Sequence, residues 1–362
     1  MSENYEDKIR NISSRLGWRN TRNFLGKGLG ITAQGLDPFI TRVNEAVSGN
    51  DDIGNAIDTF WKNLIFSGDR LIKLYRLEDE EISRLQTGLS KLLPDESSFN
   101  EAYPAPVSKG VLENCDTQLH FAETQDEVIN DKIVESTILL SKAYYSQYIE
   151  LDAEHLSDQG MELKENGGEI KCKTREVTQC FNTVILIPSD NLLIITIDLS
   201  ILPRSESAHQ QFLVERFVRE VSQVRLARPI DLFPTIQDMY EKVDGRVSQM
   251  TFITADGNSS SLKLKPSQQC LRRDSYHHGG ESASPILTKY KLGKIWDIAK
   301  SPSMTVSVEL TLPGKRAMLD DPKKYLFDAT IQSSPSLDCL IFVVDKLLTS
   351  LSSIEASRLA KI

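Results

Sequence analysis

The most informative pattern of hydrophobic and polar residues lies near the middle of the chain, between residues 169 and 200. Two apolar segments rich in β-branched residues, 181–187 and 192–198, flank the polar tetrad Pro188-Ser189-Asp190-Asn191. This order predicts a strand, a tight turn and a second strand. The second segment is apolar at almost every position, which indicates a strand covered on both faces. The pattern therefore predicts a sheet near the centre of the chain.

The first 95 residues follow a different pattern. Apolar residues recur at intervals of three or four, which predicts helices over residues 4–17, 36–48, 51–65 and 79–93. One short alternating segment, residues 70–77, predicts a strand. We interpret residues 1–95 as a small, mainly helical N-terminal domain.

Prolines and serines punctuate residues 94–112, which predicts a linker. Beyond it, residues 133–151 are rich in β-branched and aromatic side chains, which favours strands over a helix of that length. The Asp256-Gly257 step predicts a hairpin turn between two further strands. Helical spacing returns in residues 206–225, in residues 234–243 and from Ser336 onward.

The remaining alternating segments predict strands over residues 247–254, 260–265, 286–297, 303–312 and 324–333. Together these elements predict the α+β class. A small helical N-terminal domain is followed by a larger domain, residues 113–362, with a mainly antiparallel sheet and packed helices.

The formal net charge of −9 is unevenly distributed along the chain. Residues 1–100 contribute −2, residues 101–165 contribute −10, and residues 166–362 contribute +3. An acidic chain is not typical of proteins with a broad phosphate-binding surface. A local basic patch in the C-terminal half stays compatible with these totals.

The five cysteines are odd in number and form no C-x-x-C pair, which disfavours a zinc ribbon or a redox motif. The N-terminus lacks the apolar core of a signal peptide, and no window reaches the ~18 apolar residues of a membrane span. The spacings of P-loop NTPases, Rossmann dehydrogenases, protein kinases, α/β-hydrolases and zinc fingers do not occur. We therefore expect a soluble, cytoplasmic protein that contacts no membrane.

Two acid-x-lysine pairs follow one another, Glu162 with Lys164 and Glu169 with Lys171. Metal-dependent nucleases of the PD-(D/E)xK type place such a pair on a strand, where carboxylates hold Mg²⁺ or Mn²⁺ and the lysine assists the attacking water. Asp152 or Asp158 could be the upstream acid that completes the set. A solvated strand edge with alternating charges explains the same residues, and we favour it.

The polar loop 270–280 concentrates the chemically versatile side chains Arg272, Arg273, Tyr276, His277 and His278. Arginine and tyrosine can hold phosphates or stack on bases, and histidine can act as a general base or ligate a metal. An exposed connection between two strands is the commoner explanation. The loop is nevertheless the first candidate for a binding site, because loops on rigid scaffolds often carry function.

A third candidate is the helix over residues 206–225, where Arg216 and Arg219 share one face. This face could bind a phosphate backbone or an acidic partner. Pairing with the acidic segment 101–165, or plain solvation, would explain it equally well.

No complete catalytic set emerges from these patterns. We expect a non-enzymatic binding protein without a cofactor, which works as a subunit of a multi-protein assembly and contacts protein or nucleic acid. The alternative is a divergent Mg²⁺- or Mn²⁺-dependent nuclease built on the acid-x-lysine pairs. A weaker third hypothesis is a hydrolase or transferase centred on His277 and His278.

Overall fold

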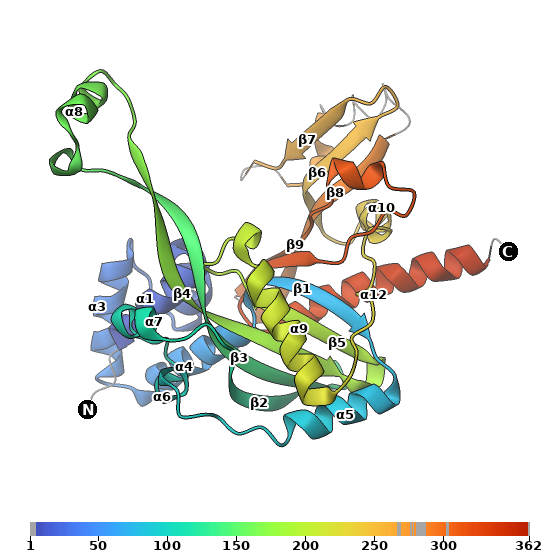
Figure 1. The fold of residues 1–362 in the computed structure, drawn as a ribbon, viewed down its shortest axis with the longest axis horizontal. Helices are drawn as coiled ribbons and strands as arrows, with labels where there is room; N and C mark the ends of the chain where they lie inside the picture. Colours follow the sequence, from blue (N-terminus) through green and yellow to red (C-terminus); the bar gives the residue numbers. More distant parts are fainter. Residues whose placement is uncertain are drawn as a thin grey trace.

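The computed structural model describes residues 5–265, 269–275, 277, 279, 287–301 and 304–360. It confirms the α+β class and the mainly antiparallel sheet. Ten strands form one sheet in the order β2-β3-β4-β5-β1-β10-β9-β8-β6-β7, and helices lie against both of its faces (Figure 1). Every pair of neighbouring strands is antiparallel.

The strands are β1 (Gly68–Arg76), β2 (His120–Ile129), β3 (Lys132–Glu150), β4 (Lys171–Ile187), β5 (Leu192–Asp198), β6 (Arg246–Thr254), β7 (Ser259–Lys263), β8 (Leu287–Ser301), β9 (Met304–Leu312) and β10 (Ala329–Ser334). The helices are α1 (Tyr5–Leu16), α2 (Trp18–Thr21), α3 (Leu36–Val47), α4 (Asp51–Phe66), α5 (Asp79–Leu89), α6 (Ser98–Ala102), α7 (Lys109–Asn114), α8 (Asp158–Glu165), α9 (Ala208–Ser222), α10 (Thr235–Glu241) and α12 (Leu337–Leu359). None of these described helices combines the length and apolar composition needed to cross a bilayer.

The N-terminal region is helical, as its apolar spacing predicts. Its one strand, β1, lies in the middle of the sheet, between β5 and β10. The domain boundary near residue 95 stays a prediction. Strand β1 belongs to the N-terminal region in sequence but pairs with β5 and β10 of the C-terminal region. The expected linker contains the short helices α6 and α7.

The hairpin predicted around the tetrad 188–191 is present as β4 and β5, with Ile187 opposite Leu192. Asn191 adopts the left-handed conformation (φ 53°) that a tight turn requires and that asparagine tolerates. All seven residues of β5 are buried, which confirms a strand covered on both faces.

Two apolar cores explain that burial. Leu71, Val184 and Ile195 face one side of the sheet, where they pack in one cluster with apolar residues of α5 and α9. Alternate residues of the same strands face the other side, where they join a larger cluster that includes α1, α3, α4 and α12. The period of two along each strand therefore supplies both cores.

Among the strands that the structure describes, β2 is the one that the sequence analysis did not predict. It lies at one edge of the sheet and pairs with β3 alone. Its residues alternate in burial, but its middle, residues 123–127, is entirely polar, so no apolar face marks it as a strand. The segment 133–151 is one strand, β3, which confirms the preference for strand over helix.

Strands β3 and β4 continue far beyond their neighbours. Pairing with β2 ends at Leu140, and pairing with β5 ends at Thr183. Ten further register pairs, from Ser141–Cys180 to Glu150–Lys171, form a two-stranded ribbon. At ~3.3 Å per residue this ribbon is about 33 Å long. We call it the arm; Figure 1 shows it projecting from the body with α8 at its tip.

Candidate functional site

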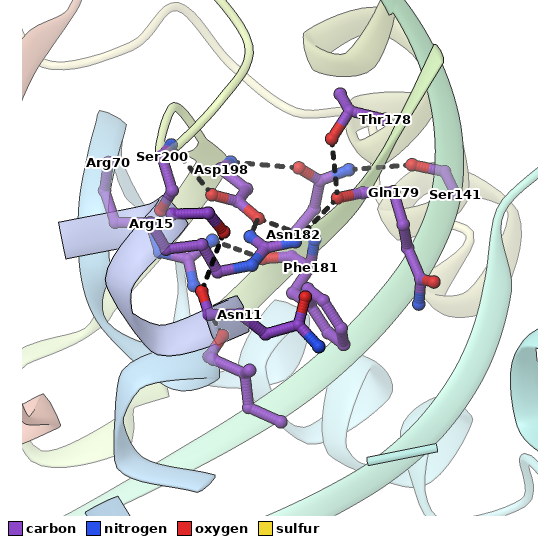
Figure 2. A network of polar contacts seen from close by, with 12 residues as sticks. Asn11, Arg15, Arg70, Ser141, Thr178, Gln179, Phe181, Asn182, Asp198 and Ser200 are labelled. Atoms are coloured by element: carbon purple, nitrogen blue, oxygen red, sulfur yellow. Dashed lines mark hydrogen bonds and ion pairs between the residues drawn. The ribbon is translucent and has the colours of Figure 1, made fainter. Parts of the chain in front are cut away.

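A buried ionic network fixes the base of the arm (Figure 2). The guanidinium of Arg15, on α1, donates to Asp198 Oδ2 at 2.6 Å and to the carbonyl of Gln179 at 2.9 Å. The Arg15 guanidinium also lies 4.8 Å from the centre of the Phe181 ring. The side chains of Arg15 and Asp198 are 6% and 2% exposed, so the pair connects α1, β4 and β5 inside the protein.

A second buried arginine, Arg70 on β1, donates to the carbonyls of Ser67, Phe181 and Ile65. Burial by itself would raise the pKa of Asp198. Arg15 and Arg70 outweigh burial, together with the backbone N–H groups of Phe181 and Ser200, and hold this pKa at about 2. Asp198 therefore stays ionised inside the core at neutral pH.

The network continues to the opposite face of the sheet. Asn182 accepts from the backbone N–H of Asp198 at 3.1 Å and donates to Gln210 Oε1, on α9, at 2.8 Å. Ser141 also donates to Gln210 Oε1, at 2.6 Å. These hydrogen bonds hold α9 against the base of the arm, so the strands of the ribbon start from a fixed position.

One face of the arm carries aromatic and basic side chains. Directly opposed residues of an antiparallel pair share a face, so Tyr148 lies beside Lys173, its register partner. The same alternation places Tyr144, Lys171 and Arg175 on this face. Tyr148 is 69% exposed and Tyr144 is 37% exposed. We call these five residues the ribbon face.

The ribbon face has unpaired positive charge. The Arg175 guanidinium lies over the Tyr144 ring, 4.1 Å from its centre, and Lys171 forms a 2.6 Å ion pair with Glu169. Within the described part of the chain, neither Lys173 nor Arg175 forms an ion pair. The charges of Lys173 and Arg175 and the exposed ring of Tyr148 are thus available to a ligand, whereas Arg175 already stacks on the ring of Tyr144.

A cavity of about 460 Å³ lies at the foot of the ribbon face. Tyr144, Arg175 and His209 contribute to its wall, with Glu206. The carboxylate of Glu206 accepts the backbone N–H of Ser146 through both of its oxygens, at 3.1 and 3.0 Å. Glu206 therefore fixes the edge of the ribbon. Its negative charge stays in the same cavity wall as Arg175, because a neutral N–H donor does not cancel it.

The two acid-x-lysine pairs do not form the site that a nuclease of this type would need. Glu162 and Lys164 lie on the exposed helix α8 rather than on a strand, and Lys164 donates to the carbonyl of Leu151 at 3.0 Å. Glu169 and Lys171 pair with each other. Neither glutamate joins a group of three potential metal ligands in the described residues, where the acids and histidine of the tip form one exposed group, Asp152, Glu154 and His155.

The loop from residue 270 has a partly structural role. Arg272 donates to the carbonyls of Tyr240, Lys242 and Gly245 at 2.7–3.0 Å, so it closes the C-terminal end of α10. His277 is 2% exposed, and its Nε2 lies 2.7 Å from the Tyr240 hydroxyl. Arg273 is exposed. The predicted Tyr276 and His278 lie outside the described residues.

The arginines of α9 lie on its exposed face, as the helical spacing predicts. Arg216 pairs with Glu220 at 3.2 Å on the same helix. The Nε of Arg219 lies 3.4 Å from the carbonyl of Glu215. These contacts are within α9, and none reaches the acidic segment 101–165.

Sequence reasoning missed the ribbon face. A signal was available in the alternation of Lys171, Lys173 and Arg175, but the predicted strand began ten residues later because only its apolar part was recognised. No protein-family model matches the chain, and a search of curated proteins found no similar sequence.

Proposed function

We propose that this chain is a non-enzymatic binding protein whose ribbon face binds single-stranded nucleic acid. The observation that carries the proposal is the gathering of two exposed tyrosines and three cations on one face of a projecting ribbon. Proteins bind single strands with basic grooves that track the backbone and with aromatic rings that stack on bases. The ribbon face has both components.

The geometry suits an extended strand. Residues two apart on a β-strand are separated by ~6.6 Å, so Lys171, Lys173 and Arg175 form a regular row of charge. Tyr148 and Tyr144 lie beside this row on β3. A tyrosine ring accepts any base, because every base has a π-face. We therefore propose little sequence preference.

The acidic tip of the arm limits where a nucleic acid can bind. Residues 151–170 contain six acids and one lysine, so they repel phosphate. The nucleic acid is therefore placed along the ribbon, toward the body, and away from α8. The slightly basic balance of residues 166–362 agrees with this placement.

A protein partner is the second part of the proposal, and it concerns the tip. Helix α8 buries no residue, and it exposes Leu163 to 60% and Met161 to 37%. Apolar side chains within an acidic, projecting segment suit a basic protein surface with an apolar centre. This partner would make the chain a subunit of a larger assembly.

Fluorescence anisotropy with labelled single-stranded DNA and RNA over a salt series tests the first part. Affinity should fall with salt, and Lys173→Gln with Arg175→Gln should reduce the slope by about 1.4, at ~0.7 per cation removed from a single strand. Tyr148→Ala should weaken binding by ~5- to 150-fold, the equivalent of 1–3 kcal/mol.

Arg216→Gln is the matched control, because it removes an exposed arginine from α9. Equal losses in this control and in the ribbon variants would show general electrostatics, and absence of binding at low salt would refute the proposal. The same assay with Mg²⁺ or Mn²⁺ covers the nuclease alternative. Metal-dependent cleavage that Lys171→Ala abolishes would replace a binding function with a catalytic one.

A further inference from the structure

A second cavity, of about 700 Å³, lies at the far end of the sheet from the arm, between the end of α10 and strands β6 and β8. Its wall includes Gly245, Arg246, Cys270, Arg272 and Arg273. Cavities of a few hundred cubic ångströms are the usual size for small-molecule sites. Three arginines at one cavity indicate an anionic occupant.

Two of these guanidinium groups have no counter-ion within the described part of the chain. Arg272 donates to three backbone carbonyls, and Arg273 donates to Gln269 Oε1 at 3.4 Å. Neutral oxygens satisfy donors but leave the positive charge uncompensated. The wall contains these three arginines and two acids, Glu241 and Asp297, so the cavity keeps a net charge of +1 that favours an anion.

Two buried N–H groups beside the cavity have no acceptor among the residues that the structure describes. They are Nε of Arg246 and Nε1 of Trp296. Trp296 is 4% exposed, and its indole nitrogen would lie 2.9 Å from a Cβ added at Gly245, so the ring is in contact with the cavity wall. Buried donors normally have acceptors. Of the two groups, only Arg246 lines the cavity, so a ligand there would supply an acceptor for its Nε.

The acids at this cavity are already engaged. Asp297 accepts from Arg246 Nη2 at 2.9 Å and from the Ser307 hydroxyl at 2.5 Å. Glu241 accepts from Gln237 at 2.5 Å. Because Asp297 holds only the Nη2 side of Arg246, the Nε side of that guanidinium stays unused.

We infer that this cavity binds a phosphomonoester group. Its charged donors come from two separate parts of the chain, Arg246 on β6 and Arg272 and Arg273 of the segment 269–273. This arrangement suits a tetrahedral phosphate better than a planar carboxylate. The group belongs either to a free nucleotide or to the 5′ end of a nucleic acid strand, and both present the same oxygens. The inference does not depend on the ribbon face.

The thiol of Cys270 gives the cavity a chemical reporter. Burial would raise its pKa, but hydrogen bonds from Val247 and Arg272 outweigh burial and lower it. A thiol with a lowered pKa reacts faster with alkylating reagents near neutral pH. A phosphate in the cavity should therefore slow the alkylation of Cys270 by iodoacetamide.

Calorimetric titration of the intact protein with inorganic phosphate and with AMP tests the inference. We expect saturable binding that Arg273→Gln and Arg246→Gln each weaken at least about tenfold, since a hydrogen bond to a charged group is worth about 1.5–3 kcal/mol. Arg216→Gln should leave affinity unchanged. Alkylation of Cys270, followed by mass spectrometry, should slow in proportion to occupancy.

Oligonucleotides with a 5′-phosphate or a 5′-hydroxyl distinguish the two sources. A preference for the phosphorylated end that Arg273→Gln removes would assign the site to strand ends, whereas binding of AMP alone would assign it to free nucleotides. Lack of saturable binding by any of these probes would overturn the inference. So would affinities that both arginine variants leave unchanged. Ribbon variants such as Lys173→Gln should leave the affinity for AMP unchanged, so the two proposals can fail separately.

Discussion

The ionic network at the base of the arm makes a quantitative prediction for Arg15→Met. Methionine keeps most of the buried volume but removes the charge next to Asp198. Removal of one partner from a buried ion pair costs about 3–5 kcal/mol, mainly because the other charge stays buried. Asp198 retains Arg70 nearby and two backbone N–H donors. We therefore expect a loss at the lower end, about 3 kcal/mol at pH 7.

The effect should depend on pH. In the native protein the pKa of Asp198, about 2, lies below its ordinary value of 3.8. The carboxylate therefore contributes stability above pH ~4 and loses it as pH falls through 2. Loss of Arg15 raises the pKa of Asp198 in the folded state. The difference between native protein and variant should thus be largest at neutral pH and should shrink in acid.

Urea unfolding, followed by tryptophan fluorescence, measures the change, with Trp61 only 5.9 Å from the Arg15 guanidinium. The double variant Arg15→Met/Asp198→Asn should recover part of the loss, because it removes the unpaired charge. Arg10→Met, an exposed control on the same helix, should change stability far less. A loss below about 1 kcal/mol for Arg15→Met, or a double variant less stable than the single one, would refute the reasoning.

Three further predictions follow from individual positions. Burial raises the pKa of Asp69 from 3.8 to about 6, so the free energy of unfolding should fall by ~2 kcal/mol as pH rises from 4 to 7. Asp69→Asn should abolish that part of a urea-denaturation pH profile, and an unchanged profile would contradict this prediction. Gly88→Ala should destabilise by ~1–3 kcal/mol in thermal melts despite a better helix former, because its Cβ would lie 2.3 Å from the Val221 carbonyl. Replacement of residues 152–169 by Asn-Gly should leave the urea midpoint almost unchanged, since α8 buries no residue; a large drop would show that the tip supports the fold.

Local pattern was sufficient for most elements of the fold. The hairpin of β4 and β5 and the helices α1, α3, α4, α9 and α12 follow from periodicity, because the period of apolar residues sets both the element and its buried face. The same logic failed for β2. The middle of this edge strand, residues 123–127, is polar, so it has no apolar run from which a strand could be predicted.

The candidate site was harder to predict for a related reason. The outer part of the arm has no core beneath it, so its strands lack the apolar face that identifies a strand. The alternation of tyrosines and cations becomes informative only when the register of β3 and β4 is known. In the loop at 270–280, Arg272 and His277 make internal contacts that the sequence alone did not reveal. Its role as a binding site stays a prediction.

The sequence by itself determined the fold class, most helices and the central hairpin, since these depend on neighbours within about four residues. Tertiary structure alone decided the position of β1 between β5 and β10, and the pairing of Arg15 with Asp198, 183 residues away. It also decided which arginines are buried in the core and which line a cavity. Such contacts join distant segments through packing, and no local period of the chain records which segments will meet.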